Sequence, residues 1–587
     1  MLKQAMRSIG IMLKYARVPT IISLAGVLLE AVEMPLRILF TGQLVRVIAS
    51  FAGGAADIGE VILWGALLLA SLLLSTASAA IRNMSSVYCL RALNKNFTHV
   101  VLDKFRKTEY ACFEDKDVLD SIERMGNEPQ QRIYYLFSRT ASALATIVSL
   151  IGTAVVFTQI SVWFAVLYLV LLAPMLWLDY KWEEELQRLW NTEMPNWRRR
   201  TYLSALLADK HAMFELKLFG AVGYTLEKWK FFADAFRREY VQTKIKSSKY
   251  GIFRDIMLAA WAIFVVVSLL TKLTNQTVDL GSFTACIASM GTILGLSQTL
   301  SGMFSLVSQD CIIMWHFDIF MNLHEVREDV PAQKSVPANV HIRFDNVCFT
   351  YPKTNRPVLN NLSFEIRPGE RVALVGENGA GKSTIVKLLC GLYAPQHGEI
   401  SVNGTPITNL SAGERRAVFS VVFQDYASFE LTLRENVAFG DIKKLHDDEQ
   451  IENALRRGLW TEDLPLDTNL GKLEDDGVDL SGGQWQRLAV SRALISDASF
   501  IILDEPTAAL DPVAESRMYE TFQSVLFGRG CVMISHRLAS ARLADKIIVI
   551  DGGAAVQCGS HSELMAEDGL YKVMYTAQSQ WYSEVEV

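Results

Sequence analysis

The chain has 587 residues, half of them hydrophobic, and a net charge of −6. Such a length exceeds what one hydrophobic core supports and predicts two or three domains, and the negative charge argues against a nucleic-acid partner. The eight cysteines have no paired or metal-binding spacing, which indicates reduced thiols in a membrane protein or one that faces the cytosol. The apolar residues gather in long runs within the first 310 positions, so this part is expected to cross a lipid bilayer.

Residues 1–17 carry four basic side chains among apolar ones. The pattern predicts a short interfacial helix that leads into an uncleaved span. A secretory signal peptide is the alternative. It is disfavoured because Glu30 and Glu33 interrupt the following apolar stretch and no small-residue cleavage site stands out.

Six membrane spans are expected within a domain that covers residues 18–326. Each is close to the ~20 apolar residues that a bilayer requires, and we place them at 18–50, 58–81, 134–158, 161–181, 250–273 and 281–306. The connections after the second and fourth spans are long and basic, whereas the others are short and nearly free of Lys and Arg. The positive-inside rule therefore predicts a multi-pass protein of the plasma membrane with both termini in the cytoplasm. The long connections have few Gly or Pro residues, so the spans should continue as helices into two cytoplasmic hairpins.

Charged residues are rare in the expected spans. Glu30, Glu33 and Arg37 share one helix face, and a charged face inside a membrane normally turns toward a partner or toward a cavity, where it would bind a polar substrate. The alternative is an ion pair between Glu33 and Arg37 that only locks helix packing. The sixth span is rich in Ser and Thr residues, and two roles remain open for them. They could contact the substrate, or they could form hydrogen bonds to neighbouring helices.

A polar linker with two prolines is expected at 327–340, followed by a second domain at 341–587. This domain opens with alternating apolar and polar residues, a strand pattern that ends at Tyr351. An aromatic side chain at this position is usually part of a core. Upstream of a phosphate-binding loop it could instead stack on a nucleobase.

A phosphate-binding loop is indicated where a buried strand, Val372 to Val375, meets an amphipathic helix. Between them stands Gly376-Glu377-Asn378-Gly379-Ala380-Gly381-Lys382-Ser383-Thr384. Glycines at this spacing let backbone N–H groups converge on phosphate oxygens, and the following helix directs its positive dipole end at the same anion. Lys382 is expected to reach the β- and γ-phosphates, and the Ser383 hydroxyl to bind Mg²⁺.

Two acidic residues follow a second buried strand, which runs from Phe500 to Leu503. In an open α/β sheet the carboxyl ends of the strands face the phosphates of a bound nucleotide. We therefore expect Asp504 to hold Mg²⁺ through water and Glu505 to act as the general base toward the attacking water.

The whole chain resembles an ABC transporter of the exporter type, a half-transporter with six spans and one nucleotide-binding domain. The most specific resemblance is Leu480-Ser481-Gly482-Gly483-Gln484, which is similar to the family signature. The remaining motifs occur in family order. They are Tyr351 at the A-loop, Gln424 at the Q-loop, Asp504-Glu505 as Walker B, Asp511 in the D-loop and His536 in the H-loop. One departure is Asp475, which stands where exporters usually have Glu before the signature.

The resemblance implies a fold and a mechanism. The fold is the type IV exporter, an all-α six-helix transmembrane domain with long cytoplasmic extensions, followed by an α/β P-loop ATPase. ATP with Mg²⁺ binds the phosphate loop of one subunit and is sealed by Ser481, Gly482, Gly483 and Gln484 of the other. Gln424 joins Ser383 and Asp504 as a metal contact, Asp511 contacts the nucleotide, and His536 assists Glu505 in catalysis. Coupling helices, expected near 112–124 and 202–213, transmit nucleotide occupancy to the spans and drive alternating access.

Several alternatives remain open. All ATPase motifs are intact, which favours a homodimer over the competent half of a heterodimer. The cargo is expected to be amphipathic, a peptide, a drug-like molecule or a lipid, and the chain has too few residues before the first span for a leader peptidase. An importer of a siderophore-like molecule would carry an additional siderophore-binding domain, which the sequence does not indicate. An ATP-gated channel is disfavoured by Glu505, and a soluble ABC ATPase by the six spans.

Overall fold

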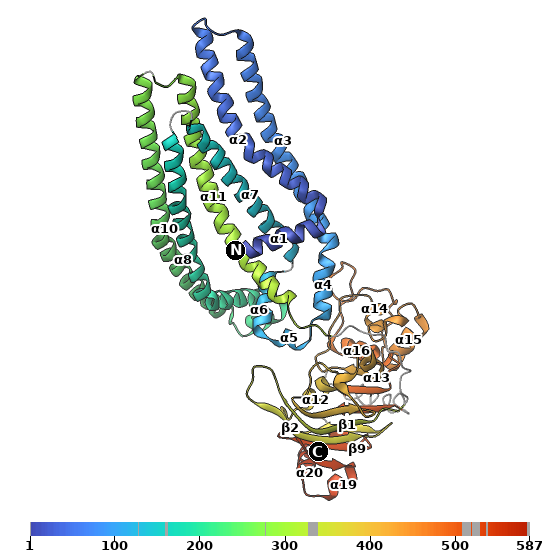
Figure 1. The fold of residues 1–587 in the computed structure, drawn as a ribbon. Coiled ribbons are helices and arrows are strands. Elements are labelled where there is room, and N and C mark those ends of the chain that lie inside the picture. Colours follow the sequence, from blue (N-terminus) through green and yellow to red (C-terminus); the bar gives the residue numbers. More distant parts are fainter. Residues whose placement is uncertain are drawn as a thin grey trace. The chain divides into compact units, whose positions relative to one another are not determined.

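The computed structural model describes residues 2–126, 128–158, 162–275, 277–326, 339–506, 518, 529–535 and 538–583. The chain forms two compact units. The helical unit comprises Met1–Lys104 and Asp120–Asn322, and the α/β unit comprises Phe105–Leu119 and Leu323–Val587 (Figure 1). A short segment from the first half of the sequence thus belongs to the second unit, and it contains the start of the coupling helix expected near 112–124.

Helices of 4 to 53 residues make up most of the first 322 residues of the chain. They are α1 (Leu2–Tyr15), α2 (Arg17–Ala52), α3 (Ile58–Asn96), α4 (Thr98–Lys107), α5 (Ala111–Glu114), α6 (Lys116–Met125), α7 (Pro129–Phe157), α8 (Val162–Ala208), α9 (Lys210–Leu218), α10 (Val222–Thr274) and α11 (Leu280–Met321). Each of the six expected spans falls on one of these helices, to within one residue at its ends.

Five of the described helices are long and apolar enough to cross a membrane. Their most apolar stretches lie in Ile58–Lys107, Pro129–Val156, Val162–Leu189, Val222–Thr274 and Leu280–Met321. The first expected span coincides with α2, which carries Glu30, Glu33 and Arg37 and does not count among these five. In α3 only 6% of the most apolar stretch is buried. A helix that is apolar all round but so little covered by protein suits a lipid environment.

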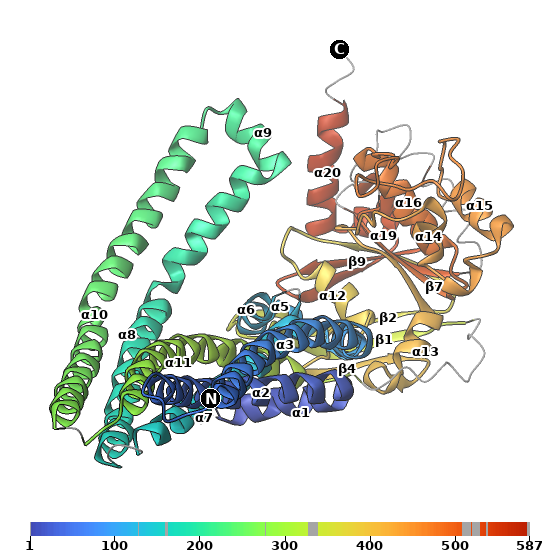
Figure 2. The same ribbon diagram turned by 90° about the horizontal axis from the view of Figure 1, so that it is seen from above.

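The helices continue beyond the expected spans, as the polar connections predicted. At a rise of ~1.5 Å per residue, α10 with its 53 residues is far longer than the ~30 Å of a bilayer core. It runs beside α8, and α9 joins the two ends (Figures 1 and 2). The expected coupling helix at 202–213 falls on the end of α8 and the start of α9. The one at 112–124 covers α5 and most of α6.

Serine residues of α11 bond to the α8–α10 pair. The Ser297 hydroxyl lies 2.9 Å from the Tyr168 hydroxyl, Ser301 accepts from Arg254 at 2.7 Å, and Ser305 donates to Glu183 at 2.6 Å. These residues recur about once per helical turn and so lie on one face. Of the two roles left open for the polar residues of this span, the contacts of Ser297 and Ser301 favour hydrogen bonding between helices.

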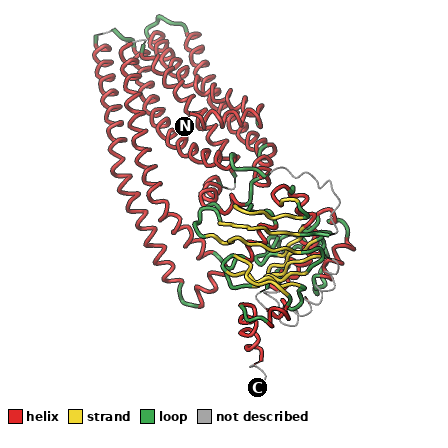
Figure 3. The backbone as a smooth tube through the Cα atoms, turned by 60° about the horizontal axis from the view of Figure 1, so that its bottom comes forward, coloured by secondary structure: helices red, strands yellow, loops and turns green. Residues whose placement is uncertain are grey.

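The α/β unit contains two sheets, which Figure 3 shows in yellow. An antiparallel sheet has the order β2-β1-β4-β5, and a second sheet has the order β10-β9-β3-β8-β7-β6, parallel except for β10. The strands are β1 (Ile342–Thr350), β2 (Pro357–Ile366), β3 (Arg371–Val375), β4 (His397–Val402), β5 (Thr405–Pro406), β6 (Phe419–Val422), β7 (Phe500–Asp504), β8 (Gly530–Ile534), β9 (Lys546–Asp551) and β10 (Ala554–Gly559).

Helices cover the parallel strands on both faces, which explains their continuous apolar runs. The helices described beyond residue 339 are α12 (Lys382–Leu389), α13 (Ala412–Val418), α14 (Leu433–Ala438), α15 (Asp448–Arg457), α16 (Gly482–Leu494), α18 (Leu538–Ala541), α19 (His561–Ala566) and α20 (Leu570–Ser583), with short 3₁₀ turns η1 (Ile407–Asn409) and η2 (Ile442–Lys444). In β7, Phe500 and Ile502 pack in the cluster that contains α12 and the antiparallel sheet, whereas Ile501 and Leu503 pack in the cluster that contains α16.

Candidate nucleotide site

The phosphate-binding loop begins where β3 ends, in the middle of the parallel sheet. Three of its glycines have positive φ angles, +155° at Gly376, +82° at Gly379 and +103° at Gly381. Space is also limiting at the first of them, since a Cβ on Gly376 would lie 2.2 Å from the Ile550 carbonyl oxygen of the neighbouring strand β9. The conformation and the close approach together explain why glycine occupies this position.

Lys382 is the first residue of α12 and is almost fully buried. Its ammonium group donates to the carbonyl oxygens of Gly376 at 2.8 Å and Glu377 at 2.9 Å, so it holds the loop from inside. Burial lowers the pKa of Lys382, and the nearby Glu505 and Asp504 carboxylates oppose that shift. A phosphate group would supply the counter-charge that this buried cation requires.

The two acidic residues at the end of β7 have different environments. Asp504 is buried, and its Oδ1 atom has no hydrogen-bond partner among the described residues. Burial, reinforced by the adjacent Glu505 carboxylate, raises the pKa of Asp504 to about 6. Hard oxygen donors suit Mg²⁺, and a buried carboxylate oxygen without a donor, beside the Ser383 hydroxyl of the loop, fits such an ion.

Glu505 has a φ angle of +51°, which is uncommon for a residue other than glycine. Its backbone N–H donates to the Ile534 carbonyl oxygen at 3.0 Å, and its carboxylate accepts a hydrogen bond from the Gln424 side chain at 3.1 Å. Such local backbone strain clusters at functional sites, where the surrounding structure holds it in place. Glu505 lines the same cavity as the loop residues.

A cavity of about 930 Å³ surrounds the loop. Of the residues that the sequence predicted for the nucleotide, eleven line it. They are Tyr351, Glu377, Asn378, Gly379, Ala380, Gly381, Lys382, Ser383, Thr384, Gln424 and Glu505. The Tyr351 hydroxyl lies 3.1 Å from the Thr384 hydroxyl, so the aromatic ring is tied to the start of α12.

The structure adds lining residues that sequence reasoning missed. They are Arg356, Pro357 and Val358 at the start of β2, and Asp551, Gly552 and Gly553 at the β9–β10 turn. An Asp-Gly pair between two apolar strands is a hairpin signal, so the turn could have been found in the sequence. Its proximity to the loop could not, because that depends on β9 pairing with β3.

The signature residues do not line this cavity. Ser481 caps α16, and its side chain and that of Gln484 bond to each other's backbone N–H groups. The Gln484 side-chain amide also donates to Glu462 at 2.8 Å. Both ends of this amide are therefore bonded within its own chain. Gly376 and Asp504 lie next to the cavity without lining it, whereas Asp511, His536 and residues 327–338 of the expected linker fall outside the described residues.

The candidate substrate residues are engaged in ion pairs. Glu33 is buried and lies 3.6 Å from Arg37, and Glu30 pairs with Arg82 of α3. These contacts favour the packing role that the sequence left open. Among the described residues no cluster of three or more His, Cys, Asp or Glu side chains could hold a metal ion.

A phosphate loop at the end of a central strand, with two carboxylates at the end of another parallel strand, defines a P-loop ATPase. The ABC transporter family matches residues 359–508. The subtilin transport ATP-binding protein SpaT of Bacillus subtilis is 30% identical over 81% of this chain and 78% of its own length. The chain therefore belongs to the ABC transporter family.

Two further similarities extend the comparison. An ATP-dependent lipid A-core flippase of Methylobacillus flagellatus is 31% identical over 62% of this chain and 61% of its own length. A solved structure of a bacterial Atm1-family ABC exporter with ATP bound has a TM-score of 0.76 at 23% identity, and the match covers 96% of this chain and 98% of that one. The chain thus has the exporter fold. It is a multi-pass membrane protein that binds ATP and couples its hydrolysis to transport.

Proposed function

We propose that two copies of this chain form an exporter that moves an amphipathic compound out of the cytoplasm. The observation that carries the proposal is the separation of the two ATP motifs. Ser481 and Gly482 are exposed at the start of α16, yet neither lines the cavity of their own chain. A helix N-terminus with free backbone N–H groups attracts an anion, and the γ-phosphate bound to a second copy is the natural partner.

In this mechanism the loop amides and Lys382 bind the phosphates, while Tyr351 provides a surface for the base. Mg²⁺ would be held by Ser383, Asp504 and Gln424, and when bound it neutralises charge on the phosphates. Glu505 accepts a proton from the attacking water, and the hydrogen bond from Gln424 keeps its carboxylate in position. We retain Asp511 and His536 as proposed contacts of the nucleotide, with His536 beside the γ-phosphate.

The first half of the coupling region supports this scheme. Residues 105–119 belong to the α/β unit, where the Lys107 carbonyl oxygen accepts from the Val326 N–H at 2.8 Å and the Glu109 N–H donates to His324 at 3.3 Å. A segment flanked by α3 and α7 thus packs with the unit that binds ATP. We propose that it transmits nucleotide occupancy to the spans, together with residues 202–213.

The cargo is proposed as a class only. The relatives are named for the transport of subtilin and for the flipping of the lipid A core, and both names are compatible with an amphipathic peptide or lipid. We propose outward transport because the chain has the fold of an exporter. The positive-inside pattern supports an orientation in the plasma membrane with both termini and the ATPase in the cytoplasm.

The proposal is tested with the chain purified alone in lipid nanodiscs. A homodimer should hydrolyse ATP without a second protein, and an amphipathic cargo should stimulate that activity. Absence of hydrolysis, with ATP binding intact, would contradict the homodimer and identify this chain as the competent half of a heterodimer. ATP-driven uptake into vesicles whose cytoplasmic face is inside would identify an importer instead.

The variant Gly482→Ala tests whether the signature residues contact the ATP of a second copy without disturbing the fold of their own chain. A Cβ at Gly482 would meet no atom of its own chain within 4 Å, so thermal unfolding and ATP binding should be unchanged. The added methyl group should keep the γ-phosphate of the other copy away from the helix N–H groups. Hydrolysis should then fall by roughly tenfold or more, the size expected for losing one hydrogen bond to a charged group. Gly10→Ala in α1, where a Cβ also has open space, is the matched control. Full activity in Gly482→Ala would remove the support for sealing by a second copy.

A further inference from the structure

Charged and aromatic groups pack against the ring of Tyr351. The Lys387 ammonium lies over the Tyr351 ring, 5.2 Å from its centroid, and 5.8 Å from the centroid of Tyr393. The two tyrosine rings meet edge to face at 5.4 Å. Tyr351 lines the cavity but Lys387 does not, among the described residues. The Tyr351 ring thus borders the cavity and also carries a cation that does not line it.

Lys387 also bonds to the 105–119 segment. Its ammonium donates to Glu114 of α5 at 3.1 Å, and the Tyr393 hydroxyl donates to the other oxygen of the same carboxylate. Burial disfavours the charged form of Glu114, but the hydrogen bonds from Tyr393 and Lys387 outweigh it and hold the pKa of Glu114 below its usual value. Glu114 is therefore a charged anchor that keeps the ammonium of Lys387 over the ring.

We propose that Lys387 is a positioning residue for nucleobase binding, which holds Tyr351 in the plane that receives the base and links that plane to Glu114 of α5. The inference rests on the proposed role of Tyr351 as the base platform. A cation–π contact and the Thr384 hydroxyl fix the ring before a nucleotide arrives, so less side-chain freedom is lost on stacking. Because coupling between two sites is reciprocal, base stacking should in turn stabilise the contact of Lys387 with Glu114.

The test uses ligands that differ in the base. ADP and pyrophosphate are titrated into the full chain in nanodiscs, since neither requires hydrolysis at Glu505 and only ADP carries a base. Lys387→Met should weaken ADP binding about two- to fivefold, the factor that corresponds to one exposed cation–π contact. Pyrophosphate binding should stay unchanged, and Lys387→Arg should retain the affinity of the parent chain for ADP.

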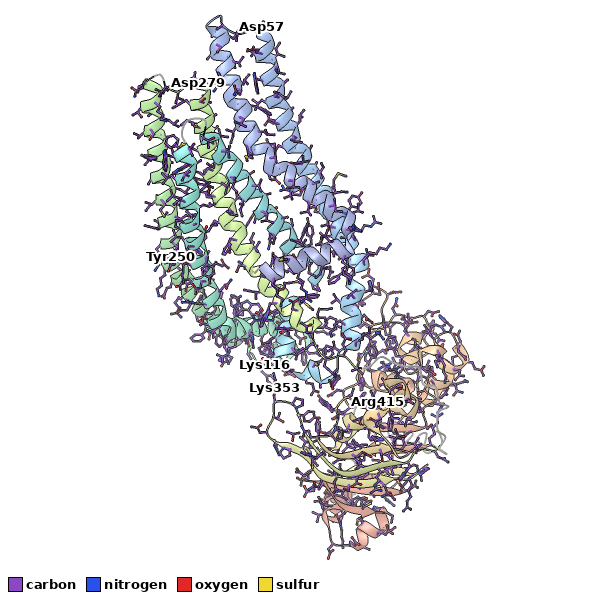
Figure 4. All side chains as sticks on the ribbon, in the orientation of Figure 1. Asp57, Lys116, Tyr250, Asp279, Lys353 and Arg415 are labelled. Atoms are coloured by element: carbon purple, nitrogen blue, oxygen red, sulfur yellow. The ribbon has the colours of Figure 1, made fainter. Side chains whose placement is uncertain are left out.

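Lys353 offers a matched control. It bonds to the same segment, through Asp115 at 2.5 Å and Asp117 at 2.6 Å (Lys353 is labelled in Figure 4), but it makes no described contact with the Tyr351 ring. Lys353→Met should therefore leave the ratio of ADP to pyrophosphate affinity unchanged. Hydrogen exchange provides a second readout. ADP should protect residues 105–119 more than pyrophosphate does in the parent chain, and Lys387→Met should abolish the difference.

The outcomes separate this inference from the proposed function. If Tyr351→Ala leaves ADP affinity unchanged, the base platform itself is wrong. If Tyr351→Ala weakens ADP but Lys387→Met does not, or if Lys387→Met weakens ADP and pyrophosphate equally, Lys387 has no positioning role. Should Lys387→Met fail to fold, Glu114→Gln carries the test, because loss of the anchor should weaken ADP selectively. An unchanged ADP-to-pyrophosphate ratio in that variant would overturn the inference.

Discussion

Glu505→Gln should lower ATP hydrolysis by about 10²- to 10⁴-fold, the usual contribution of a general base, while ATP binding persists. Glutamine has nearly the same shape and can keep a hydrogen bond to Gln424, but it cannot accept a proton from water. The loss of hydrolysis should be large because both the backbone and the side chain of Glu505 are held in place. The backbone of Glu505 is held at positive φ and its carboxylate is fixed at 3.1 Å from the Gln424 amide.

Asp551→Asn is the matched control for Glu505→Gln. Asp551 is also acidic and lines the same cavity, from the β9–β10 turn, but it has no proposed part in the chemistry. Its substitution should leave the turnover rate within about twofold, as expected for a surface change. Hydrolysis that survives in Glu505→Gln would show that another group is the base. Loss of hydrolysis with unchanged cargo flux would instead favour a channel over a pump.

Gly376→Ala should destabilise the α/β unit by about 2–6 kcal/mol and abolish ATP binding, the sum of backbone strain and overpacking. The added Cβ would lie 2.2 Å from the Ile550 carbonyl oxygen, and a backbone atom of a central strand cannot move aside cheaply. This clash can be removed only if β3 and β9 move apart or the loop adopts another backbone conformation. Thermal unfolding and equilibrium ATP binding measure the two effects.

The variant Gly379→Ala separates the cost of a positive φ angle from the cost of a steric clash with β9. Gly379 also has positive φ, at +82°, but a Cβ there would meet no atom within 4 Å. It should therefore show only the strain, about 1–2 kcal/mol, and a smaller loss of ATP binding. Equal destabilisation of the two variants would contradict the close approach of β9 as the reason for glycine at position 376.

The nucleotide cavity could be largely predicted from the sequence because its residues lie in short local patterns. A strand, a glycine-rich turn and a helix follow each other directly around Lys382, and spacing alone brings them together. The same holds for Asp504 and Glu505 at the end of an apolar strand. In contrast, the positive φ of Glu505 accompanies a bond from its N–H to Ile534 of the neighbouring strand β8, which the spacing does not reveal.

The role of the charged residues in α2 could not be predicted from the sequence. Glu30, Glu33 and Arg37 share a helix face in any α-helix, so the sequence leaves cavity lining and ion pairing equally possible. The fold decides by bringing Arg82 of α3 beside Glu30 and by burying Glu33. The role of the serines of α11 could not be predicted either. Their hydrogen-bond partners Tyr168, Glu183 and Arg254 lie more than 40 residues away along the chain.

The amino-acid sequence by itself determined the class of this protein, its division into apolar helices and a P-loop ATPase, and most residues of the nucleotide cavity, because each follows from periodicity or from motif spacing. Only the tertiary structure decided that the segment joined to the α/β unit runs from 105 to 119, that Asp551 to Gly553 line the cavity, and that Lys387 contacts both the Tyr351 ring and Glu114. These contacts join segments far apart in the chain, and long-range pairing depends on how whole strands and helices pack rather than on any local pattern.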